Sequence, residues 1–142
     1  MRLVRRLSIV LLACAAAIGS DDARAAEPTV IEIAPPPAAY ATDATALRAA
    51  AAGEIKKLNT TLMRGRRRVV VSLSLAPPAS EPIVCNVNAT VRDAKTGTLI
   101  AVIQSATRAG GPVTAAQRKE LAYSAVRSAV RRVPTALAGT NR

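Results

Sequence analysis

The sequence predicts an α+β fold, a four-stranded and mostly antiparallel sheet with two helices on one of its faces. Four segments alternate apolar and polar residues with the period of two that is typical of strands, and two segments repeat apolar residues at helical spacing. Their order is β-α-β-β-β-α. The first two strands should pair in parallel through the first helix, and the last three should form a meander. Because each helical segment has one apolar stripe, both helices are expected on the same side of the sheet.

The first strand is expected over Thr29–Ala34, which is rich in β-branched residues. Pro35–Pro37 then form a stiff connector that cannot join a ladder or a helix. Asp43 is a good N-cap for the first helix, which should end near Met63 with Gly65 in the left-handed C-cap position. The apolar stripe of this helix consists of Leu47, Ala51, Ile55, Leu58 and Leu62.

Three strands follow the first helix. Between the last two, Asp93–Gly97 predicts a tight hairpin, because Asp favours the start of a type I turn and Gly tolerates a positive φ. Ile100 and Val102 make the second face of the last strand partly apolar, which is typical of a central strand. The three predicted strands are Arg66–Leu75, Ile83–Arg92 and Thr98–Thr107.

Thr114 and Gln117 have the spacing of a capping box, so the second helix should begin there. Pro134 should end it, and residues 135–142 should form a flexible tail. The apolar stripe of this helix consists of Leu121, Ala122, Ala125, Val126, Ala129 and Val133.

The first 25 residues have the layout of a secretory signal peptide. Basic residues precede the apolar run Leu7–Ile18, and Ala23-Arg24-Ala25 offers an A-x-A cleavage site. This run of 12 residues is shorter than the roughly 20 that a transmembrane helix needs. We therefore predict a signal peptide over 1–25, a short strand and proline-rich connector over 26–42, an α+β domain over 43–134 and the tail.

Leu11-Leu12-Ala13-Cys14 supports a second interpretation. It resembles the lipobox of bacterial lipoproteins, in which the cysteine is acylated and becomes the first mature residue. Against this, the sequence stays apolar from Cys14 through Ile18. The protein is expected to be periplasmic or secreted, and it is attached to a membrane only if Cys14 is lipidated.

The charge of the chain limits its partners. Of its 20 basic and nine acidic residues, four and two lie in the first 25, so the remaining 117 residues carry a net charge of +9. Such a charge favours polyanionic surfaces, for example lipopolysaccharide, anionic lipid or an acidic polymer. The alternative is a solvated basic surface without a dedicated ligand. Because the chain is expected to be exported, intracellular nucleic acid is not expected as a partner.

Composition also excludes several kinds of chemistry. The chain has no histidine, which removes Ser-His-Asp triads, Cys-His dyads and His-ligated metals. It has no nucleophile elbow, phosphate loop, dinucleotide fingerprint or metal-ligand cluster. Asp93 and Glu120 could form an acid pair, but a turn explains the first and the start of a helix explains the second. We expect no catalytic residue, no cofactor and no metal, and hence no enzyme.

The candidate anion-binding residues are Arg64, Arg66, Arg67 and Arg68, at the expected end of the first helix. Four guanidinium groups there could hold phosphate or sulfate groups bidentately. The alternative is that they complement the negative end of the helix dipole and stay solvated. A second basic group, made of Arg127, Arg131 and Arg132, should lie on the outer face of the last helix.

Cys85 alternates with Val87 and Ala89, so its side chain should point into the core and behave as a small apolar group. With cleavage after Ala25 it is the sole cysteine left. A buried free thiol and an intermolecular disulfide both stay open.

Within residues 66–137, the runs VVVSLSL, CNVNATVRDAKTGTLIAVIQSATRA and AVRSAVRRVPTAL resemble small exported proteins of high-GC bacteria of the myxobacterial type. This resemblance implies export and supplies no activity. The order α-β-β-β-α also resembles the double-stranded RNA-binding domain, whose lysine-rich helix start would fall at Arg118-Lys119; the export signal argues against that role. The sequence thus favours a non-catalytic exported protein acting as a binding or accessory module, with polyanion binding through Arg64, Arg66, Arg67 and Arg68 as the alternative.

Overall fold

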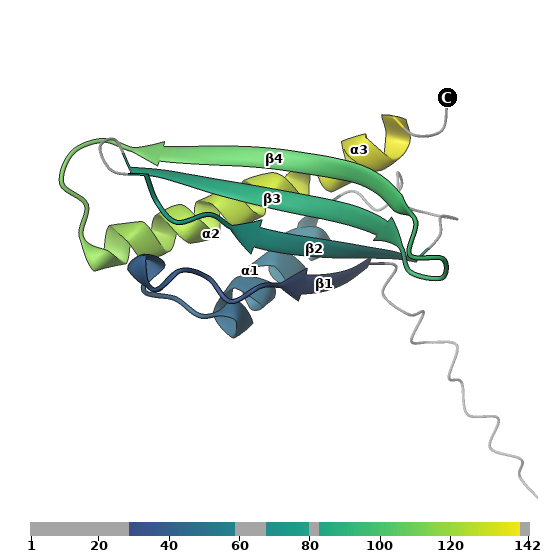
Figure 1. Ribbon diagram of the computed structural model, residues 1–142, viewed down its shortest axis with the longest axis horizontal. Coiled ribbons are helices and arrows are strands. Elements are labelled where there is room, and N and C mark those ends of the chain that lie inside the picture. Colours follow the sequence, from purple (N-terminus) through teal and green to yellow (C-terminus); the bar gives the residue numbers. More distant parts are fainter. Residues whose placement is uncertain (1–28, 59–67, 80–82, 140–142) are drawn as a thin grey trace, which may run out of the picture.

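The computed structural model describes residues 29–58, 68–79 and 83–139, and it confirms the predicted fold class. The sheet has the strand order β1-β2-β3-β4, with β1 and β2 parallel and the other neighbours antiparallel (Figure 1). The elements are β1 (Thr29–Ile33), the 3-10 helix η2 (Ala38–Tyr40), α1 (Ala44–Lys57), β2 (Val69–Leu75), β3 (Ile83–Asp93), β4 (Leu99–Ala109), α2 (Ala115–Arg131) and α3 (Val133–Gly139).

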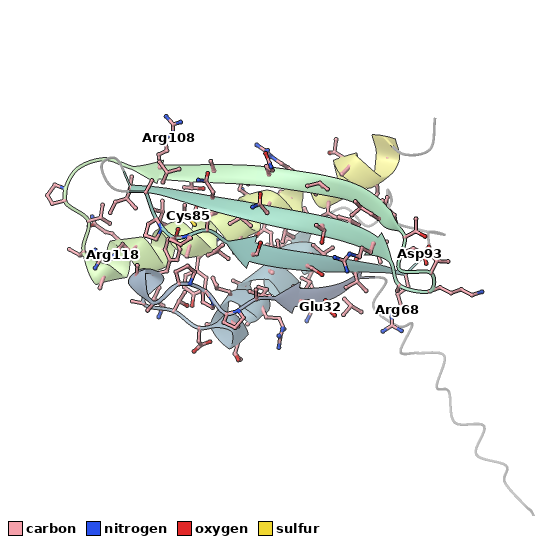
Figure 2. All side chains as sticks on the ribbon, viewed as in Figure 1. Glu32, Arg68, Cys85, Asp93, Arg108 and Arg118 are labelled. Atoms are coloured by element: carbon pink, nitrogen blue, oxygen red, sulfur yellow. The ribbon has the colours of Figure 1, made fainter. Side chains whose placement is uncertain are left out.

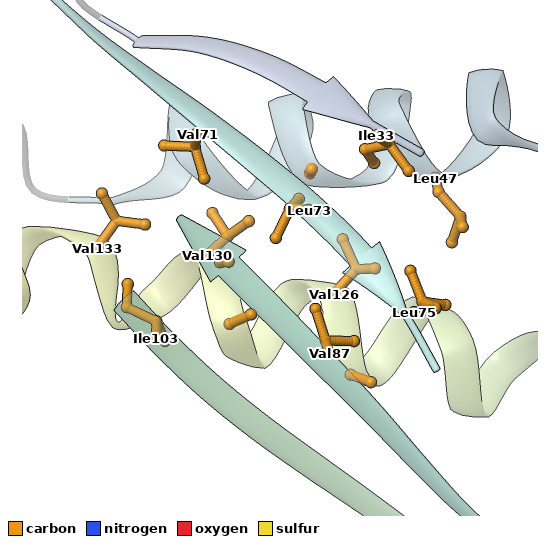
Figure 3. Packing of buried hydrophobic residues seen from close by; sticks show 14 of the residues in the cluster. Ile33, Leu47, Val71, Leu73, Leu75, Val87, Ile103, Val126, Val130 and Val133 are labelled. Atoms are coloured by element: carbon orange, nitrogen blue, oxygen red, sulfur yellow. The ribbon is translucent and has the colours of Figure 1, made fainter. Parts of the chain in front are cut away.

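The core lies between the sheet and the helices. Helices α1 and α2 lie side by side on one face of the sheet, as predicted, and none of the described helices covers the other face, which we call the uncovered face (Figure 1). Alternate residues of each strand point into this layer, where they meet the apolar faces of the two helices (Figure 3). Burying these aliphatic side chains, at about 25 cal/mol per Å² of apolar surface, is the main stabilising contribution. The core between the sheet and the helices includes Val71, Leu73, Val87, Val91, Leu47, Leu121, Val126 and Val130.

Tyr40 is the largest fully buried side chain in the described part of the chain. The short helix η2 carries it into the core, where its hydroxyl donates a 2.7 Å hydrogen bond to the backbone oxygen of Ala76. The hydroxyl also interacts with the Cys85 thiol, which is buried as predicted. Burial raises the pKa of both groups, so both are uncharged at neutral pH.

Helix α1 begins as predicted but ends earlier. The Asp43 side chain accepts a 2.7 Å hydrogen bond from the backbone nitrogen of Ala46, which confirms the N-cap. The predicted end near Met63 is wrong, because the helix stops at Lys57 and Leu58 has extended backbone angles. The N–H of Leu58 bonds to the oxygen of Ile55 and closes the last turn in 3-10 fashion. Gly65 lies outside the described residues.

Helix α2 begins with the predicted capping box, in which Thr114 and Gln117 exchange side-chain-to-backbone hydrogen bonds of 3.2 and 2.8 Å. It ends at Arg131, and the chain continues as α3 rather than as the tail expected from residue 135. Pro134 lies in the first turn of α3, where a missing N–H costs nothing. Leu137 is buried against the core, which explains why this segment stays helical.

The hairpin between β3 and β4 also forms as predicted. Oδ1 of Asp93 accepts hydrogen bonds from the backbone nitrogens of Lys95 and Thr96, at 2.8 and 3.0 Å, and Gly97 has a φ of 72°. Only glycine adopts this φ without strain, so the turn requires it.

Strand β4 is an edge strand of the sheet, so the central position expected from Ile100 and Val102 is wrong. A register shift at Val91/Arg92 pairs Leu99 with Arg92 and Ala101 with Val91, so Ile100 is the extra residue of a β-bulge. Ile100 and Ala101 both pack against the core, which leaves Leu99 on the uncovered face. The bulge places Ile100 against the core, and this accounts for an apolar residue at a position where simple alternation would put it on the uncovered face.

Candidate functional site

The structure places one of the four candidate anion-binding arginines. Arg68 is exposed directly before β2, at the end of the sheet that holds the β3–β4 hairpin (Figure 2). Its backbone oxygen accepts a 2.8 Å hydrogen bond from the nitrogen of Ala94 in that hairpin. Arg64, Arg66 and Arg67 lie outside the described residues, so the four-arginine site stays a prediction.

The second basic group does not form one site, because each arginine binds a different partner. Arg127 donates to Glu120 at 2.6 Å on the surface of α2. Arg131 donates through Nε to Glu54 of α1 at 2.5 Å. Arg132 reaches the backbone oxygen of Gln104 on β4 at 2.8 Å. Arg131 therefore holds α2 to α1 and Arg132 holds the end of α2 to the sheet edge, whereas Arg127 pairs within α2.

Glu54 is a buried acidic residue that the sequence analysis did not single out. The hydrogen bond from Arg131 holds the pKa of its carboxyl group below the usual value. The ammonium of Lys57 lies 4.0 Å away and adds to this effect. The signal was present in the sequence, since Leu47, Ala51, Glu54 and Leu58 step by four, three and four along one helix face. A search that counts only apolar residues on this helix face does not find Glu54.

Asp93 and Glu120 do not come together as an acid pair. Asp93 is buried in the hairpin, whereas Arg118, two residues before Glu120, lies at the opposite end of the molecule (Figure 2). Within the described residues, no group of three or more His, Cys, Asp or Glu side chains could hold a metal ion.

No helix of the described chain covers the second face of the sheet (Figure 1). Its half away from the hairpin is polar: Ser74 pairs with Asn88, which pairs with Gln104, and Asn86 extends this set. Such hydroxyl and amide groups can donate and accept hydrogen bonds from a partner. We call this set the polar half of the sheet face.

The half near the hairpin differs in character. The register aligns Val30, Val70, Arg92 and Leu99 in one row across the four strands. Leu99 and Val102 are 55% and 58% exposed, and they are the exposed large apolar residues of the described chain. Arg68 and Lys95 are exposed beside this row, at the start of β2 and in the hairpin. We call this set of seven residues the hairpin end; it combines two exposed apolar side chains (Leu99 and Val102) and two half-buried ones (Val30 and Val70) with three exposed cations.

None of the helices in the described residues is long and apolar enough to span a membrane.

The α+β fold defined here has counterparts among solved structures. The chain is similar to a protein from Caulobacter crescentus CB15 described as a candidate lipoprotein, with 16% identity and a TM-score of 0.48 over 79% of this chain and 88% of that one. It is similar to the PelC dodecamer from Paraburkholderia phytofirmans, with 12% identity and a TM-score of 0.49 over 73% of this chain and 86% of that one. A leucine-to-methionine variant of that PelC, in another crystal form, gives 13% identity and a TM-score of 0.49 over 75% and 86% of the two chains.

No protein-family model and no curated protein sequence matches the chain.

Proposed function

We propose that this protein is exported to the cell envelope or secreted, and that it acts without catalysis as a binding or accessory module. The observation that carries the proposal is the uncovered face of the sheet, which offers a binding surface while the core is closed by the helices on the other side. The signal-like first 25 residues supply the expectation of export.

The acidic side chains of the described residues support a non-catalytic role, because each takes part in holding the fold. Asp43 caps α1 and Asp93 orders the hairpin. Glu54 and Glu120 bind arginines, and Glu32 accepts a 3.1 Å hydrogen bond from Ser72. A general acid or base needs a carboxyl group that can reach a substrate and change its protonation.

Processing of the leader is the direct test of export. We expect the protein isolated from the producing cell to begin at Ala26, because Ala23 and Ala25 provide the small residues that signal peptidase requires. Intact-mass analysis of the envelope and culture-medium fractions measures this. A mass that fits an acylated N-terminal Cys14 would show that the protein is a lipoprotein and is not released from the membrane by cleavage after Ala25. An intact leader on a cytoplasmic protein would contradict the proposal.

The alternative function is polyanion binding through Arg64, Arg66, Arg67 and Arg68. Replacing all four with glutamine should then abolish retention on immobilised heparin and flatten its salt dependence, because fewer counterions are released. Arg68, the one of the four that the structure describes, is exposed directly before β2, so its replacement should change folding little.

The matched control for this experiment uses four exposed basic residues elsewhere, Arg48, Lys56, Arg108 and Lys119. Arg127, Arg131 and Arg132 would be poor controls, because their replacement breaks structural hydrogen bonds. An equal loss of retention in the control variant would mean that only total charge matters. Absence of retention in the parent at low salt would remove the alternative.

A further inference from the structure

The starts of β1 and β2, the β3–β4 hairpin and the surface that we call the hairpin end all lie at one end of the sheet. The register aligns Thr29 with Val69 and Val69 with Asp93, so β1 and β2 begin where β3 and β4 are joined. The hairpin end defined above lies here, with Arg68 and Asp93 close to one another at this end and Arg108 at the other (Figure 2). The chain that precedes Thr29 is therefore attached at the same end.

Three of the exposed charged residues at this end are positive, and the fourth, Glu32, lies in the same row as Val102. Arg68, Arg92 and Lys95 are exposed, whereas the one acidic residue of the hairpin, Asp93, is buried with its carboxylate turned to the backbone of the turn. Glu32 is the acidic residue of the uncovered face; it lies one row further in and accepts a hydrogen bond from Ser72. The outermost row thus presents one cation, Arg92, and Arg68 and Lys95 are exposed beside it.

The exposed apolar side chains lie among these cations. Leu99 stands next to Arg92 in the register, and Val102 stands next to Thr90 in the following row. The β-bulge is what leaves Leu99 on this face. The polar half of the face carries Ser74, Asn86, Asn88 and Gln104, and at its far end half-buried Val84 pairs with exposed Arg108. The two exposed large apolar side chains of the described residues, Leu99 and Val102, therefore lie at the hairpin end of the face.

Apolar side chains surrounded by cations fit the surface of an anionic bilayer. The cations approach lipid phosphates while the apolar groups enter the boundary between head groups and acyl chains. A soluble polyanion would use the cations but has no use for Leu99 and Val102.

We propose that the hairpin end, made of Val30, Val70, Leu99 and Val102 with Arg68, Arg92 and Lys95, is a docking surface for anionic membrane lipid. This proposal rests on the proposed export of the chain, which brings it to the envelope. It leaves the polar half of the sheet face and the helices directed away from the bilayer.

Vesicle binding tests the proposal with the processed protein as isolated from the cell. The probe is a vesicle of phosphatidylcholine with one third phosphatidylglycerol, compared with phosphatidylcholine alone. We expect Arg68→Gln, Arg92→Gln and Lys95→Gln together to weaken binding about 100-fold, since each cation near an anionic surface strengthens it roughly fivefold. The matched control Arg48→Gln, Arg108→Gln and Lys119→Gln removes the same charge elsewhere and should weaken binding much less.

A second variant separates membrane docking from capture of a soluble polyanion. Leu99→Gln with Val102→Thr should weaken vesicle binding roughly tenfold and leave heparin retention unchanged, because both side chains are exposed and contribute only lipid contact. Circular dichroism checks that both variants fold.

Several outcomes would overturn the proposal. They are equal losses in the matched control, binding that ignores phosphatidylglycerol, and no vesicle binding by the parent. Sedimentation that shows a dimer abolished by the Leu99 and Val102 changes, without vesicle binding, would assign the surface to a second copy of the chain. Intact mass reports leader processing and the variants report vesicle binding, so failure here is distinguishable from failure of export.

Discussion

Replacing Tyr40 with alanine is expected to lower the free energy of unfolding by about 3–5 kcal/mol, the usual cost of removing a large buried side chain. Tyr40 is fully buried, and the chain holds only one other aromatic residue, Tyr123, which is partly buried. The core around Tyr40 is aliphatic and close-packed, so it cannot collapse fully into the vacated volume. Urea denaturation followed by far-UV circular dichroism measures the change.

The matched variant Tyr40→Phe keeps the ring and removes the hydroxyl. It leaves the backbone oxygen of Ala76 without its 2.7 Å hydrogen bond, which should cost about 1–3 kcal/mol. The difference between the two variants reports the packing of the ring alone. If alanine costs no more than phenylalanine, the ring does not fill the core as described here.

The sheet and its helices could be predicted from the sequence because burial leaves a periodic trace. In β3, Cys85, Val87 and Ala89 alternate with exposed polar residues, and the structure buries these three. The capping box at Thr114 and the turn at Asp93 were predictable for the same kind of reason, since each depends on residues close in sequence. A four-stranded order then follows from short connections.

The features that were missed depend on contacts between distant segments. Tyr40 enters the core through a single 3-10 turn that no periodic pattern marks, and its partner Ala76 lies 36 residues away. Glu54 is buried because Arg131 reaches it from another helix, 77 residues along the chain. The edge position of β4 was also missed, because a bulge changes which of its residues face the core.

The candidate site divides in the same way. The run from Arg64 to Arg68 is visible in any reading of the sequence, but its neighbours in space are not. Arg92, Lys95 and Leu99 join Arg68 only because the parallel and antiparallel registers bring the start of β2 next to the hairpin. A surface assembled from three segments leaves no local motif, which explains why sequence analysis proposed arginines alone and passed over the apolar side chains beside them.

Raising the pH above about 9–10 is expected to destabilise the protein steeply, because burial raises the pKa of both Tyr40 and Cys85 from ordinary values of 10.0 and 9.0. In the unfolded chain these groups lose their protons at the ordinary values, while the folded state keeps them. The unfolded state then binds fewer protons, so stability is complete below about pH 9 and falls as the pH rises toward the folded pKa. Each group contributes up to about 1.4 kcal/mol per pH unit within that window.

Urea denaturation at a series of alkaline pH values measures the slope of stability against pH, and Tyr40→Phe combined with Cys85→Ala should make this slope shallower. Tyrosinate absorbance from Tyr40 and reaction of Cys85 with a thiol reagent should both appear together with unfolding. Rapid labelling of Cys85 in the folded protein at pH 9, or an unchanged slope in the double variant, would show that these groups are not buried together in the core.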